Sequence, residues 1–153
     1  MQLIRAPLVP FDDLLPEMAI RADRPRLSKR LWRANAEDGT EFGFEVESPL
    51  QDGDVVWTTT KFRYVMRQEP EPVLEIPLDV DPDAAAVIGW AVGNLHFPVE
   101  AQPGRLLAPD DPALRQALGR LGIHFHFATE VFRPHRFSGS LAGHGHGHAS
   151  HTH

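Results

Sequence analysis

Residues 73–132 read VLEIPLDVDPDAAAVIGWAVGNLHFPVEAQPGRLLAPDDPALRQALGRLGIHFHFATEVF, and this stretch decides the fold. Its first six residues are predicted as a strand, and residues 81–93 then place apolar side chains at helical spacing. Asp81 is the predicted N-cap of this helix, Pro82 its first residue and Gly93 the residue after its last turn. The side chains predicted to face the core are Ala84, Val87, Ile88, Ala91 and Val92.

The second half of the stretch repeats the pattern. Its predicted elements are strands over 97–101 and 105–108, a helix over 110–122 and a strand over 123–132. Pro103 and Gly104 separate the two short strands, and Asp111 followed by Pro112 is typical of a helix start. The side chains of the second helix predicted to face inward are Ala113, Leu114, Ala117, Leu118 and Leu121. The order β-α-β-β-α-β predicts a ferredoxin-like domain over 71–133.

Residues 1–70 are predicted to form a small all-β domain, a sandwich or a barrel. Phe42, Phe44 and Val46 alternate with polar residues, and the Asp38-Gly39 pair before them is typical of a tight turn. Further predicted features are strands over 55–60 and 61–67 and a linker over 68–72. The fold class expected for the whole chain is therefore α+β.

Residues 134–153 have no hydrophobic periodicity and end in GHGHGHASHTH. This composition predicts a tail that is disordered without a ligand. Five of the nine histidines of the chain lie in this tail: His144, His146, His148, His151 and His153.

The tail has the chemistry of a metal ligand, because neutral imidazole suits Ni²⁺, Cu²⁺ and Zn²⁺. Alternating glycine lets the backbone fold several imidazoles around one ion. We expect binding near neutral pH and release below about pH 6, where the imidazoles become protonated. Ni²⁺ and Cu²⁺ should bind at least as tightly as Zn²⁺, so these residues alone do not name the metal. A purification tag is the alternative, although tags are usually unbroken runs of histidine.

Composition argues against several classes of protein. A net charge of −6 without a basic run argues against nucleic-acid binding. The absence of cysteine leaves imidazole and carboxylate as the ligands for a transition metal. No apolar stretch is long enough for a membrane span and no signal peptide is present, so a cytoplasmic protein is expected. The sequence also lacks a nucleophile elbow, a phosphate-binding loop and a His-Glu-x-x-His motif, and we expect no enzyme.

One run of motifs resembles a known family. The residues that carry it, in order and spacing, are Gly93, Asn94, His96, Pro103, Gly104 and Asp111. They resemble the C-terminal domain of the UreE family of urease accessory metallochaperones. The histidine-rich tail and the Asp-Gly-Asp turn at 52–54 are further shared features. The resemblance covers roughly residues 27–153 and is strongest from 72 to 132.

The resemblance implies a cytoplasmic homodimer that carries Ni²⁺ to apo-urease, with Zn²⁺ or Cu²⁺ able to substitute. It also implies the accessory GTPase and the other urease accessory proteins as partners, with the β domain contacting partner proteins. One His96 from each subunit is implied to hold a single ion across the two-fold axis. The tail ligands implied to complete the shell are His144, His146, His148, His151 and His153.

Other interpretations of these residues stay open. By position alone, His96 could be a histidine that interacts with the negative C-terminal end of the first helix dipole. Asp111 could be only the N-cap of the second helix. Some family members carry histidines on both sides of this aspartate, and here Asp110 and Pro112 stand there, which makes an accessory metal site doubtful. The alternative functions are a general metal buffer without a specific client and an interaction module whose tail is artefactual.

Three more histidines lie outside the motif. His124 and His126 share one predicted strand face, opposite Phe125 and Phe127, and a solvent-facing side of a sheet explains this alternation without a metal. His135 stands where the second domain gives way to the tail, and it could join the His96 site if the tail folds back.

Overall fold

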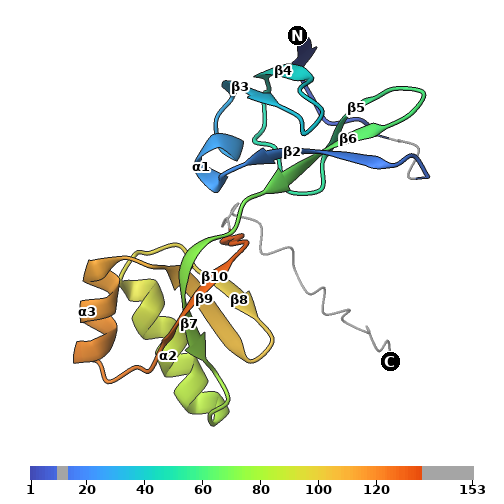
Figure 1. Cartoon of the computed structure of the whole chain (residues 1–153). Coiled ribbons are helices and arrows are strands. Elements are labelled where there is room, and N and C mark those ends of the chain that lie inside the picture. The colour runs from blue at the N-terminus through green and yellow to red at the C-terminus, as the bar shows by residue number, and fades with distance from the viewer. Residues whose placement is uncertain (10–13, 136–153) are drawn as a thin grey trace, which may run out of the picture.

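The computed structural model describes residues 1–9 and 14–135, and within them the chain is a mixed α+β protein with three sheets and three helices (Figure 1). The elements in chain order are β1 (Gln2–Ile4), β2 (Glu17–Ala22), α1 (Arg24–Leu27), β3 (Leu31–Asn35), β4 (Glu41–Glu45), β5 (Val55–Thr58), β6 (Arg63–Gln68), β7 (Glu71–Pro77), α2 (Pro82–Asn94), β8 (Glu100–Gln102), β9 (Arg105–Pro109), α3 (Pro112–Arg120) and β10 (His126–Glu130).

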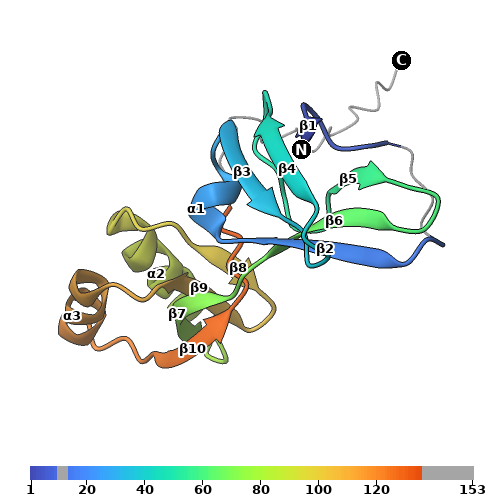
Figure 2. The ribbon, with the colours of Figure 1, turned by 45° about the horizontal axis from the view of Figure 1, so that its top comes forward.

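Two three-stranded sheets, β1-β4-β3 and β2-β6-β5, pack around one core in the first part of the chain (Figure 2). Phe42 and Phe44 are fully buried, as their alternation predicts. The ring of Trp32 stacks on Phe44 with the centroids 4.2 Å apart, and Phe42 meets Tyr64 of the other sheet at 5.1 Å. Aromatic side chains therefore join the two sheets.

The predicted turn at Asp38-Gly39 is confirmed. Gly39 has a φ of 84°, a conformation that glycine adopts without steric cost. The carboxylate of Asp38 accepts hydrogen bonds from the backbone N–H of Thr40 and from the hydroxyl of Tyr64. These bonds favour the ionised carboxylate, with the Thr40 N–H as the main cause, and they lower the pKa of Asp38.

The expectation of an all-β first part is wrong in one element. Residues 24–27 form the single-turn helix α1, whose N-cap Asp23 accepts a hydrogen bond from the backbone N–H of Arg26 at 2.7 Å. Leu27 of this helix is buried in the same core as the strands.

The second part has the element order β7-α2-β8-β9-α3-β10 and one antiparallel sheet in the strand order β10-β7-β9-β8. Both helices cover the same face of this sheet (Figure 1). Leu74 and Ile76 of β7 pack there against Val92 of α2 and against Leu114 and Leu118 of α3.

The buried faces of the two helices differ in part from the prediction. In α2, Val92 is buried and Ile88 packs against the core, whereas Ala84 and Val87 are exposed. In α3, Leu114 and Leu118 are buried as predicted, but Ala113 and Leu121 are exposed. The helices exist where the periodicity places them. The predicted buried side is too wide in both helices, and in α2 it also includes Val87 of the exposed face.

The predicted linker over 68–72 is wrong. Gln68 ends β6 and Glu71 begins β7, so only two residues lie between these strands. The side chain of Gln68 is buried and donates a 2.6 Å hydrogen bond to the carbonyl of Phe132. Arg24 of α1 pairs with Glu71 at 2.8 Å, and its guanidinium lies 5.2 Å from the centre of the Phe132 ring. The two parts therefore meet in a packed junction.

Candidate metal site

The C-terminal end of α2 carries His96 in an unusual backbone conformation. The helix does not end before Gly93 as predicted, because it continues through Asn94 with Leu95 as its C-cap. The backbone N–H of His96 then closes the last turn on the carbonyl of Gly93 at 3.1 Å. His96 itself has a φ of 61°, which places the left-handed residue that commonly ends a helix on a histidine instead of a glycine.

The imidazole of His96 is exposed, and it makes no hydrogen bond or ion pair with any residue that the structure describes. A histidine that served only to stabilise the helix end would be expected to bond its last carbonyls. The nitrogens of this ring are therefore open to a ligand.

A single copy of the described chain does not supply a complete metal site. Within residues 1–9 and 14–135, no three side chains of histidine, cysteine, aspartate or glutamate cluster closely enough to hold an ion. Because a stable site usually needs about four ligands, His96 would need ligands from elsewhere. The five predicted tail ligands lie outside the described residues: His144, His146, His148, His151 and His153.

Residues 132–135 cross back from the second part to the first, and we call them the C-terminal strap. The guanidinium of Arg133 pairs with Asp52, in the turn between β4 and β5. The backbone N–H of His135 donates to the carbonyl of Val99 at 2.9 Å, while its Nε2 accepts from the backbone N–H of Ala101 at 3.1 Å. The strap therefore runs along the outer edge of β8.

His135 is held where it is by this arrangement. Since its Nε2 accepts a hydrogen bond, the neutral ring carries its proton on Nδ1 and has no lone pair left for a metal. Val99, its backbone partner, lies only three residues after His96. The structure thus places the start of the tail near His96, but in this conformation His135 has no free nitrogen lone pair to act as a ligand.

The histidines on either side of Phe125 do not form a metal site among the described residues. His124 precedes β10 and His126 begins it, and both are exposed. The side chain of Phe127 is 65% exposed and lies at the sheet edge, with the guanidinium of Arg115 5.6 Å from its ring centre.

Asp111 and its neighbours are occupied by structural roles. The carboxylate of Asp111 caps α3 by accepting from the backbone N–H groups of Ala113 and Leu114 at 2.8 and 3.3 Å. Asp110 pairs with Arg115 at 3.0 Å, and Pro112 is the first residue of the helix. Asp81 stands at the N-cap of α2 as predicted, but its side chain makes no capping hydrogen bond.

The outer face of α2 is an exposed apolar surface that the sequence analysis did not predict. Val87 is 62% exposed and Trp90 is 71% exposed, and Asn94 follows them on the same side of the helix at the spacing of one turn. Two large apolar side chains on one exposed helix face are typical of a contact surface. Trp90 lies outside the set of side chains predicted to face the core, and this was the one feature of the sequence that could have indicated an exposed apolar face.

Comparisons with known proteins show the family of the chain. The family described as "UreE urease accessory protein, C-terminal domain" matches residues 71–153. The chain belongs to the UreE family. It is 32% identical to the urease accessory protein UreE of Deinococcus radiodurans over 143 residues, covering 84% of this chain and 90% of that protein. It is 31% identical to UreE of Nitrosococcus oceani over 139 residues, covering 90% and 79% of the two chains. It is 28% identical to UreE of Lysinibacillus sphaericus over 123 residues, covering 78% and 82%.

Membership of the UreE family associates the protein with urease maturation and with the handling of nickel. UreE proteins are accessory chaperones and not catalytic enzymes, in agreement with the expectation from the sequence. None of the helices in the described part of the chain has the length and apolar character of a transmembrane span.

Proposed function

We propose that this UreE protein is a nickel metallochaperone that delivers Ni²⁺ to apo-urease during assembly of its active site. In the proposal, His96 of each of two subunits binds one ion between them. The observation that carries the proposal is the exposed imidazole of His96, which has no partner among the described residues. His96 comes two residues after Asn94, where the outer face of α2 ends.

The outer face of α2 supports a homodimer. Val87 and Trp90 would lose contact with water in a symmetric contact between two copies of this helix, and apolar burial of this kind is the main driving force of association. The face ends at Asn94, two residues before His96. A two-fold axis beside this end of α2 would bring the two imidazoles toward each other.

The C-terminal strap supports the participation of the tail. The backbone N–H of His135 bonds to the carbonyl of Val99, and the chain from His96 to Val99 spans at most about 11 Å. The start of the tail therefore lies near His96. From His135 to His144 the chain can span at most about 30 Å. In the proposal the tail ligands reach the ion from there: His144, His146, His148, His151 and His153.

A shared site of this kind suits transfer better than storage. Two fixed imidazoles leave the ion incompletely coordinated, and tail ligands can dissociate one at a time as the ion moves to the client. Zn²⁺ and Cu²⁺ should also bind, because imidazole discriminates weakly between these ions. The proposed partners are apo-urease and the urease accessory proteins, including the accessory GTPase, in the cytoplasm, with the first part of the chain contacting partner proteins.

We assign three regions to this function. Residues 1–70 form the partner-binding domain, residues 71–133 the metal-binding and dimerisation domain, and residues 134–153 the histidine-rich tail. The strand order β10-β7-β9-β8 with both helices on one face supports a ferredoxin-like fold for the second region.

Nickel titration with parallel measurement of molecular mass tests the proposal. The wild-type protein should bind one tight ion per dimer, and His96→Ala should lose that ion while remaining a dimer. His124→Ala is the matched control, because it removes an exposed imidazole of the same domain and should leave the tight ion in place. Removing residues 141–153 should lower the total capacity while the tight ion remains or weakens modestly.

A metal buffer without a specific client gives the opposite result. Its capacity would fall in proportion to the number of tail histidines removed, and His96→Ala would have almost no effect. If the tail were artefactual, removing residues 141–153 would leave urease activation in cells unchanged.

A further inference from the structure

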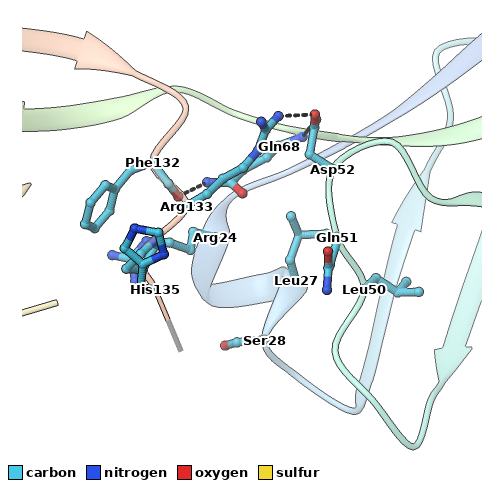
Figure 3. Close-up of a pocket in the computed structure, with 11 residues that line it drawn as sticks. Arg24, Leu27, Ser28, Leu50, Gln51, Asp52, Gln68, Phe132, Arg133 and His135 are labelled. Carbon is cyan, nitrogen blue, oxygen red and sulfur yellow. Dashed lines mark hydrogen bonds and ion pairs between the residues drawn. The ribbon is translucent and has the colours of Figure 1, made fainter. Parts of the chain in front are cut away.

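A pocket of about 520 Å³ lies at the junction between the two parts of the chain (Figure 3). Leu27 of α1 and Leu50 of the β4–β5 connection contribute apolar surface to it. Asp52 and Gln68 contribute polar groups, and the C-terminal strap forms the wall that comes from the second part. The volume lies within the range typical of ligand pockets.

The strap holds this wall in place. The carbonyl of Phe132 accepts from Gln68, the guanidinium of Arg133 pairs with Asp52, and the backbone N–H of Arg133 donates to the Glu100 carboxylate at 2.6 Å. His135, the last described residue, also lines the pocket. The chain that follows therefore starts at the rim of the pocket, and the following residues are covalently kept close to it.

The sequence after His135 contains one aromatic residue at a suitable distance. Residues 136–153 are rich in histidine, glycine and small polar residues, and their only large apolar side chains are those of Phe137 and Leu141. Phe137 is two residues beyond His135, so its Cα lies at most about 7 Å from that of His135. We propose that the pocket binds the side chain of Phe137 of the same chain.

The chemistry of the pocket suits an aromatic side chain. Leu27 and Leu50 are only 4% and 3% exposed, so they offer small apolar edges to the pocket. The guanidinium of Arg24, which lies 5.2 Å from the centre of the Phe132 ring, attracts aromatic faces. The side chains of Gln68 and Asp52 are already bonded to the Phe132 carbonyl and to Arg133. A foreign peptide could offer the same groups, but a segment attached two residues away has an effective concentration in the millimolar range or above.

The consequence is a second anchor point for the tail. With Phe137 in the pocket, the free part of the tail, which carries the histidines, would begin at residue 138. The two parts of the chain would then be joined both by the strap and by the Phe137 ring. The binding requires no metal, so it stands independently of the proposed nickel function.

Hydrogen exchange on the metal-free, full-length protein tests the inference. Phe137→Ala should speed exchange several-fold in peptides covering residues 24–28 and 50–52, because these segments line the pocket that the ring would cover. It should also lower the unfolding midpoint by about 2–4 °C, as expected for the loss of a partly buried aromatic contact in a protein of this size. Leu141→Ala is the matched control and should leave both measurements at their wild-type values, while Phe137→Leu should fall between wild type and Phe137→Ala.

Two results would overturn the inference. One is a Phe137→Ala protein whose exchange at 24–28 and 50–52 equals that of the wild type. The other is an equal effect of Phe137→Ala and Leu141→Ala, which would mean that the pocket does not select the residue next to the strap.

Discussion

At the scale of single residues, His96 combines a proposed ligand role with the backbone role of ending α2. A residue with a Cβ in the left-handed region is disfavoured by about 1–2 kcal/mol, and glycine would occupy the same position without that cost. A histidine at this position therefore costs folding free energy, and the proposed metal-binding role of its imidazole would account for a histidine here instead of a glycine. The backbone turns the chain away from α2 toward β8 at the point where the ring is presented.

The two roles can be separated by a pair of substitutions. His96→Gly and His96→Ala remove the imidazole equally, so both should lose the tight nickel ion. His96→Gly should be more stable than His96→Ala by about 1 kcal/mol, because only alanine keeps the steric conflict of a Cβ at positive φ. Urea unfolding of the two variants measures this difference, and equal stabilities would argue against a left-handed residue 96.

His96 as a metal ligand stays a prediction from the sequence, whereas the predicted end of the helix before it is wrong. Gly93 was the expected residue after the last turn, a position that glycine commonly takes. In the structure the last turn instead closes through Leu95 and His96, which bond to the carbonyls of Val92 and Gly93. A choice between two helix ends three residues apart depends on the direction of the following strand, and local patterns do not contain that information.

At the scale of elements, α2 has two apolar sides, of which one is buried against the sheet and the other is exposed. Val92 and Ile88 face the sheet, and Val87 and Trp90 face outward. Alanine and glycine occupy much of this helix, so its hydrophobic pattern is weak around the axis and the sequence could not fix which side is buried. In α3, two leucines four residues apart defined the buried side, and that part of the prediction is confirmed.

Trp90→Glu tests the outward side of α2. A charge in the centre of an apolar contact should convert the proposed dimer to a monomer at micromolar concentration and weaken tight nickel binding. Leu31→Glu is the control, because Leu31 is 76% exposed in the first part of the chain and should leave the dimer intact. Sedimentation velocity gives the two masses, and a Trp90→Glu dimer would place the subunit contact on another surface.

The strands of the first part show another limit of sequence patterns. The alternation in β4 and the Asp-Gly turn before it were sufficient to predict that strand. The strands β1, β2 and β3 had no such signal, and two of them pair in parallel with strands distant in sequence, β1 with β4 and β2 with β6. Parallel pairs lack the tight turns that reveal hairpins.

At the scale of the whole molecule, the junction makes the two parts depend on each other. The carbonyl of Phe132, at the start of the strap, accepts from Gln68 at the end of β6, and Gln68 is the buried polar side chain among the described residues. The proline-rich sequence between β6 and β7 suggested a linker because its composition is polar, yet its contacts come from α1 and from the strap, which are distant in sequence. Such contacts are invisible to local patterns.

Gln68→Met tests the coupling between the parts. The substitution keeps the approximate shape of the side chain and leaves the Phe132 carbonyl without its donor, which should lower the free energy of unfolding by about 1–3 kcal/mol. Arg21→Ala, which breaks an exposed ion pair with Glu37, should change it by less than about 1 kcal/mol. Urea denaturation compares the variants, and equal effects would mean that the junction adds little to stability.

The pairing of Asp52 with Arg133 also has a consequence for biosynthesis. These residues are 81 positions apart, so the ribosome completes the entire second sheet before the partner of Asp52 emerges. N-terminal regions generally fold first during translation. A nascent chain that stopped after β10 would contain every strand and helix of the described residues, but of the junction bonds it would keep the Arg24–Glu71 ion pair and lack those from Gln68 to Phe132 and from Asp52 to Arg133. The quality-control machinery of the cell would therefore meet a product whose two parts are less firmly joined.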